Sequence, residues 1–150
     1  HYKENLDNPA IKFSYGLLLY KFQRFTESII QFSLGIIEDD YIYKILLDKK
    51  INEEMEFFLA SKIHNAFSYK RFTFELWFNA NGAKFLKQIY DSDLFGIYYE
   101  QIIKLRKKLN SIKGTTTDDI NRRRNFLNKI AEIINTIDDD YALKLFNEIK

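Results

Sequence analysis

Residues 91–137 read DSDLFGIYYEQIIKLRKKLNSIKGTTTDDINRRRNFLNKIAEIINTI, two amphipathic runs on either side of a short polar loop. Apolar side chains recur every three or four positions in both runs, which is the spacing of one face of an α-helix. In the first run these side chains are Tyr98, Ile102, Leu105, Leu109 and Ile112. In the second they are Ile120, Leu127, Ile130, Ile134 and Ile137. The stretch therefore predicts two long helices joined by a loop.

Capping residues mark where these two helices begin and end. Asp91-Ser92-Asp93 precedes the first run, and Lys113-Gly114 follows it with a cation and a glycine that suit a helix C-terminus. Thr116 and Asp119 have the spacing of a capping box, in which each side chain accepts a hydrogen bond from the backbone N–H of the other residue. The sequence thus predicts a loop at residues 114–117 and a second helix directly after it.

The rest of the chain carries similar helix signals. We expect further helices from Asn8-Pro9 through Phe22, from Phe25 through Ile37, from Asn52-Glu53-Glu54 to His64-Asn65, from Ala83 to Tyr90, and from Asp138-Asp139-Asp140 to the C-terminus. Gln23-Arg24 either turns the chain between the first two of these or lies inside one continuous helix. The aromatic segment Phe67–Phe78 is expected in the core or in the seam of a dimer.

The composition favours a single all-α domain over residues 1–150, a bundle of about five to seven helices. One proline and five glycines are too few for the frequent turns of a β-rich fold. The absence of cysteine excludes disulfides and thiolate metal sites, and no apolar run is long enough to span a membrane. We therefore expect a soluble, cytoplasmic domain without a metal or other cofactor. Because the chain opens at His1 and not at Met, we also expect a domain cut from a longer protein.

Positive charge is concentrated in one part of the chain. Residues 101–135 contain nine basic and three acidic side chains, a net charge of +6, whereas the whole chain carries +2 and the remainder −4. Such a local excess suits a surface that faces an anionic partner, and it also occurs on ordinary solvated helix faces.

Three consecutive arginines, Arg122, Arg123 and Arg124, fall in the first two turns of a predicted helix. Cations at a helix N-terminus oppose the helix dipole, so a further reason for their presence is expected. Free N–H groups at this end attract anions, and three guanidinium groups beside them predict a phosphate-binding site. Arg123 and Arg124 also lie near the expected buried line through Ile120 and Leu127, so at least one should be buried, paired or at an interface. The alternative is that they pair with nearby aspartates on a solvated surface.

Residues 124–129, Arg-Asn-Phe-Leu-Asn-Lys, resemble the signature of HEPN domains, in particular the helical ribonuclease modules fused to nucleotide-sensing CARF domains in CRISPR-associated proteins. The family pattern is Arg, a polar residue that is often Asn, a few variable residues and then His, at the start of a late helix that follows a loop. The stretch Tyr20–Glu38 is similar to the paired opening helices of such modules. Together these resemblances extend over most of the chain.

The resemblance implies metal-independent cleavage of single-stranded RNA, in which the 2′-OH attacks the adjacent phosphate. Arg124 would contact the scissile phosphate and Asn125 would assist. Lys129 stands where the family has the histidine that manages the proton. The residues predicted to bind flanking phosphates are Arg122, Arg123 and Lys113.

Lysine does not change its protonation near neutral pH as histidine does, so the domain either cleaves RNA or is a degenerate relative that only binds it. The resemblance further implies a homodimer in which two motifs meet, a role in prokaryotic antiviral defence, and a nucleotide-sensing domain in the full-length protein. The alternative function is a non-catalytic helical module for protein–protein interaction or regulation. His64, the only histidine after His1, is expected at a helix end or on the surface.

Overall fold

The computed structural model describes residues 8–49 and 57–150, and all regular secondary structure in these ranges is α-helical. The predicted all-α class is therefore confirmed. The described residues form eight helices, one more than the largest number expected: α2 (Pro9–Lys21), α3 (Phe25–Glu38), α4 (Asp40–Leu46), α5 (Phe57–Phe78), α6 (Gly82–Asp91), α7 (Asp93–Ser111), α8 (Thr117–Asn135) and α9 (Asp139–Ile149).

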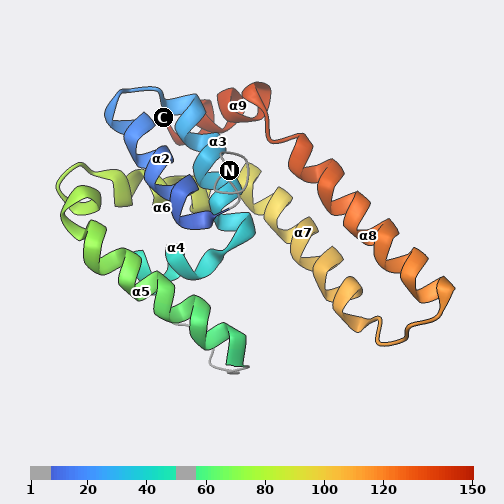
Figure 1. Ribbon diagram of the computed structural model, residues 1–150. Coiled ribbons are helices and arrows are strands. Elements are labelled where there is room, and N and C mark those ends of the chain that lie inside the picture. Colours follow the sequence, from blue (N-terminus) through green and yellow to red (C-terminus); the bar gives the residue numbers. More distant parts are fainter. Residues whose placement is uncertain (1–7, 50–56) are drawn as a thin grey trace, which may run out of the picture.

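α3 is the central helix of the body, which α2, α4, α5, α6 and α9 complete around it (Figure 1). α2 and α3 are antiparallel and pack along their whole length. Gly16 permits this close approach, because a Cβ at this position would lie 2.6 Å from the Phe32 ring. α9 packs against α3 from the far end of the chain, and a buried hydrogen bond of 2.9 Å joins Ser33 Oγ to Tyr141 Oη.

Aromatic and branched side chains fill the core of this body. The largest of the fully buried side chains are Trp77, Tyr43, Phe13, Phe32 and Phe95. Trp77 from α5 lies against both Phe13 of α2 and Phe32 of α3, with ring centroids 6.3 and 5.4 Å away. Its indole Nε1 donates to Tyr69 Oη over 3.3 Å. The aromatic segment at residues 67–78 thus supplies the core through Trp77, as expected, although several of its phenylalanines remain exposed.

α7 and α8 form a hairpin, hereafter the arm, that projects from the body (Figure 1). Each helix has 19 residues, which corresponds to a length of about 28 Å. α7 is anchored at its start by buried Phe95 and Ile102, whereas α8 buries only Ile130 and packs chiefly against α7. The loop of residues 112–116 therefore lies at the far end of the arm.

Most predicted helix starts are confirmed, because the capping side chains that mark them are in place. Asn8 Oδ1 accepts a hydrogen bond from Ala10 N at 2.9 Å, and Asp138 Oδ1 accepts one from Tyr141 N at 3.0 Å. Ser92 caps α7 through Phe95 N at 3.2 Å. α6 extends the range predicted for it by one residue at each end.

The alternatives at Gln23-Arg24 are resolved in favour of a turn. Gln23 has a φ of 60°, and Arg24 N donates to Leu19 O over 2.9 Å, which ends α2. α3 starts at Phe25 and returns along α2.

The end predicted for the next helix at His64-Asn65 is wrong, because α5 continues to Phe78. No glycine or proline interrupts this segment, and its inner side packs against α2 and α4, with Ala66 and Trp77 buried. The start predicted at Asn52-Glu53-Glu54 lies outside the described residues. α4 was not predicted as a helix, although its N-cap Asp39 accepts from Tyr41 N at 3.0 Å.

No helix in the described ranges has the length and apolar character that crossing a membrane requires.

Candidate nucleic-acid interface

The capping box at the far end of the arm forms as predicted. Asp119 N donates to Thr116 Oγ1 over 3.2 Å, and Thr116 N donates to Asp119 Oδ2 over the same distance. Thr116 Oγ1 also donates to Asp119 Oδ2 at 2.7 Å. These bonds lower the pKa of Asp119 below its usual value, and the charges of Arg122 and Arg123 add to the effect. The box therefore fixes the start of α8 and places an anion there.

Arg123 connects the loop to α8. Its guanidinium donates to Ile112 O at 3.0 Å and also to Gly114 O. Both carbonyls belong to the segment that follows α7, where backbone acceptors lack partners within the helix. Arg123 is half-buried, which agrees with the expectation that at least one arginine of the cluster would be buried or paired. The Arg123 guanidinium therefore holds the loop in place. Its contact with RNA stays a prediction, and such a contact would compete with these bonds to the loop.

Lys113-Gly114 was predicted to close α7, but the helix ends before this pair. α7 ends at Ser111, and no glycine in the described ranges has a positive φ. Glycine is needed here for a different reason: a Cβ at this position would overlap with the carboxylate of Asp119. The capping box and the glycine therefore require each other.

Arg122 and Arg124 are both exposed, on different sides of α8. Arg122 Nη1 lies 3.9 Å from Asp119 Oδ1, a long ion pair between partly solvated groups. Arg124 forms no ion pair within the described residues. It lies one turn after Ile120 and one turn before Leu127, so it shares their side of the helix.

The buried line predicted for α8 is wrong in its first half. Ile120 and Leu127 are 47% and 53% exposed, whereas Ile130 is buried as expected. Half-buried Phe126 and Arg123 occupy the inner side instead, because α7 lies on that side of α8.

The two other residues of the predicted catalytic set are exposed as well. Asn125 and Lys129 are four residues apart and share one side of α8. Arg124 precedes Lys129 by five residues, which places the two about 140° apart around the helix. Lys129 Nζ lies 5.7 Å from the centroid of the Phe126 ring, a cation–π contact. Within one chain, Lys129 and Arg124 therefore present their charges in different directions.

Lys113 is exposed in the loop, as its predicted role requires. Two further cations near the loop, Lys107 and Lys108, are exposed on the outer side of α7. The sequence counted them in the basic stretch without assigning them to the site, although their spacing from Lys104 already indicated a shared helix face. We define the basic tip as the exposed cations closest to the loop: Lys107, Lys108, Lys113, Arg122 and Arg124.

His64 does not belong to the basic tip. It is exposed on α5, and Figure 1 shows α5 and α8 on different sides of the body. The surface position predicted for this histidine is confirmed.

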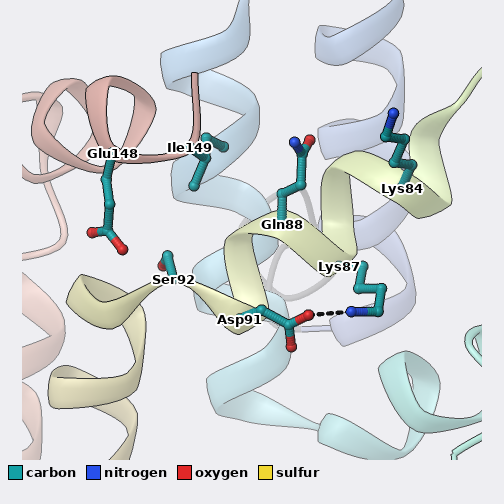
Figure 2. Close-up of a pocket in the computed structure, with 7 residues that line it drawn as sticks. All are labelled: Lys84, Lys87, Gln88, Asp91, Ser92, Glu148 and Ile149. Atoms are coloured by element: carbon teal, nitrogen blue, oxygen red, sulfur yellow. Dashed lines mark hydrogen bonds and ion pairs between the residues drawn. The ribbon is translucent and has the colours of Figure 1, made fainter.

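A surface cavity of about 440 Å³ lies between α6, the start of α7 and the end of α9 (Figure 2). Three of the four charged side chains that line it have partners among the described residues, and Lys84 is exposed. Lys87 pairs with Asp91, and Glu148 accepts from the backbone N–H groups of Asp93 and Leu94 at the start of α7. The cavity thus lies at a helix junction that these bonds hold together.

No cluster of three or more His, Asp or Glu side chains within residues 8–49 and 57–150 is arranged to hold a metal ion. Comparisons of the chain with protein-family models, with curated proteins and with solved structures find no match.

Proposed function

We propose that this chain is a HEPN-like helical domain that binds single-stranded RNA through the basic tip of the arm. The observation that carries the proposal is the exposure of five cations around one braced loop at the end of a projecting hairpin. Residues 107–124 hold six basic and two acidic side chains, a net charge of +4. A flexible polyanion can approach such a tip from several directions, and each phosphate contact releases counterions from the strand.

Within this proposal, Arg124 contacts the phosphate that the family motif would place at the reaction centre, and Asn125 assists it. Arg122 and Lys113 bind the flanking phosphates, with Lys107 and Lys108 extending the track along α7. Arg123 holds the loop that carries Lys113, since it bonds two loop carbonyls. A role in prokaryotic antiviral defence accompanies the HEPN resemblance as part of the proposal.

Binding is favoured over cleavage because the group that would move a proton near neutral pH is missing from α8. Lys129 occupies the position of the family histidine, and His64 lies on α5 away from the tip. We therefore propose recognition of RNA without hydrolysis.

Fluorescence anisotropy with a labelled single-stranded RNA tests the proposal. Arg124→Ala and Lys113→Ala should each weaken binding roughly threefold to fivefold, because each removes one partly solvated phosphate contact. Each should also reduce the slope of log K against log salt concentration by about 0.7. Lys84→Ala is the matched control for Lys113→Ala, an exposed lysine on α6 whose loss should leave affinity and slope unchanged.

Equal losses in Lys84→Ala and Lys113→Ala would contradict a site at the tip, and so would RNA binding that does not respond to salt.

A protein partner is the second candidate function, and half-exposed Ile120 and Leu127 beside Arg124 favour it. Double substitution Ile120→Ser/Leu127→Ser distinguishes the two functions. It should leave RNA affinity within about twofold if phosphates are the ligand, because no cation is removed. It would abolish binding of a protein that docks on this side of α8.

A further inference from the structure

α2 has apolar side chains on two opposite sides. Phe13 and Leu17 face the core and are buried. On the opposite side Ile11, Tyr15, Leu18 and Phe22 recur at spacings of three and four and form one stripe, with exposed fractions of 37%, 43%, 48% and 71%. A helix that is apolar all round normally has neighbours all round, yet no helix within the described residues covers this stripe.

A second apolar line on α5 adjoins the α2 stripe. Phe72 is 83% exposed and Leu76 is 50% exposed. Ser14 Oγ and Tyr69 Oη form a hydrogen bond of 3.1 Å between the two helices. Leu18 is one turn from Ser14, and Phe72 is one turn from Tyr69, so the stripe and the line flank this bond. We name the six side chains the α2–α5 face: Ile11, Tyr15, Leu18, Phe22, Phe72 and Leu76.

The size of the α2–α5 face matches what a stable dimer buries. A fully exposed large apolar side chain presents roughly 200 Å², so the six exposed fractions correspond to an apolar surface on the order of 650 Å². This is at or above the largest patch of a typical monomer, about 300–600 Å². Since somewhat over half of an interface is apolar, the face suits a contact of about 1,000 Å² per partner, within reach of stable dimers.

The charges next to Phe72 indicate which partner fits. Arg71 and Glu75 are one turn apart on the exposed side of α5, and neither forms an ion pair within the described ranges. Consider a two-fold axis perpendicular to α5 at the level of Thr73, midway between Arg71 and Glu75. The two α5 helices then run antiparallel, and Arg71 of each copy lies opposite Glu75 of the other. Opposite charges on one helix line are complementary to a second copy of the same line.

We infer that the α2–α5 face is the interface of a homodimer, with two antiparallel α5 helices crossing near Thr73 and the α2 stripes packed at the sides. The HEPN resemblance implies a dimer in which the α8 motifs meet. The interface inferred here is a different one, because it lies on α2 and α5 and leaves both basic tips free. It does not depend on RNA binding, so either proposal can fail alone.

Sedimentation equilibrium of the chain at about 100 µM, well above the micromolar constants of weak interfaces of this size, should show a dimer. Leu18→Glu should raise the dissociation constant about a hundredfold or more, since a two-fold interface contains the change twice. Leu127→Glu is the matched control, because Leu127 on the arm is 53% exposed and Leu18 is 48% exposed. It should leave the dimer intact.

Charge reversal provides a test that does not depend on apolar packing. Arg71→Glu and Glu75→Arg should each raise the dissociation constant roughly tenfold, because like charges then face each other. The double variant Arg71→Glu/Glu75→Arg should restore the original value within about threefold. A monomer at the highest concentration overturns the inference. So does a dimer that Leu127→Glu dissociates and Leu18→Glu does not, or a double variant without rescue.

Discussion

Arg123 and Arg124 are neighbours in the chain, yet their guanidinium groups have different surroundings. Arg123 is half-buried and bonds two carbonyls of its own loop, whereas Arg124 is exposed beside Leu127. The cluster that opposes the dipole of α8 therefore contains one structural cation and two that remain available to a ligand. The residue types alone predicted the cluster. The side of α8 on which each arginine lies determines whether it bonds the loop or faces solvent.

Gly114 offers the sharpest test at the scale of one residue. Gly114→Ala should lower the free energy of unfolding by about 1 to 2 kcal/mol, since the added methyl overlaps with Asp119 and opens the capping box. Gly96→Ala is the matched control within α7, where a Cβ has no neighbour within 4 Å. It should raise the free energy of unfolding by about 0.5 to 1 kcal/mol, because alanine favours the helix. Urea denaturation measures both, and equal effects would rule out the close approach.

At the scale of the helix, the sequence predicted where helices begin better than it predicted which side of each helix is buried. Asn8, Ser92, Thr116 and Asp138 cap helices through hydrogen bonds to residues two or three positions away, and such local interactions can be recognised in the sequence. The exposed position of Leu127 depends on where α7 lies, which is set by contacts between distant segments.

The difference between local and long-range interactions also explains which features of the candidate site and of α5 could be predicted. The capping box and the basic stretch were predicted, because both depend on neighbouring residues. The bond between Arg123 and the loop carbonyls could not be predicted, because it needs the three-dimensional course of residues 112–116. α5 passes through the predicted stop at His64-Asn65 because buried Ala66 and Trp77 hold it against the body, and tertiary packing overrides weak local signals.

The capping box predicts how the first turn of α8 responds to acid. Hydrogen bonds from Thr116 hold the pKa of Asp119 below its ordinary value, so the unfolded chain binds this proton more readily than the folded one. The resulting stabilisation is present above about pH 4 and is lost as pH falls through the lowered pKa.

NMR of the backbone amides of Thr116 and Asp119 should show this loss, and Asp119→Asn should remove it. Asp118→Asn is the control, because Asp118 is exposed and makes no side-chain hydrogen bond among the described residues. Its acid transition should match that of the unmodified chain. A transition that persists in Asp119→Asn would contradict the assignment.

At the scale of the molecule, one buried and one half-buried tyrosine join helices that are far apart in the chain. Tyr141 of α9 bonds Ser33 of α3, and Tyr99 of α7 donates to Asp40 of α4 over 2.9 Å. Burial raises the pKa of Tyr141 above its ordinary value, and burial together with Asp40 raises that of Tyr99. Burial likewise raises the pKa of Tyr43, which stacks on Tyr90 with ring centroids 4.0 Å apart.

These tyrosines predict alkaline unfolding of the whole body. A raised pKa means that the folded chain holds the proton more tightly, so this contribution to stability is complete below pH ~10 and declines above it. Phenolate absorbance of Tyr43, Tyr99 and Tyr141 should therefore appear together with the loss of helical circular dichroism. Replacing all three with Phe should reduce this absorbance phase, and Tyr69 and Tyr90, whose pKa values burial also raises, should retain the rest. Their ionisation in a chain that keeps its full helical signal would contradict the burial.

The concentration of positive charge in the arm gives the protein an electric dipole. The residues from 101 to 135 carry +6, and most of this positive stretch lies in a helix pair about 28 Å long. In the field of a polyanion the molecule experiences a torque that turns the arm toward the strand before any contact forms. Since salt screens fields beyond about 8 Å at physiological ionic strength, this alignment acts only in the last stage of approach. The charge distribution thus favours an approach to a polyanion in which the tip of the arm comes first.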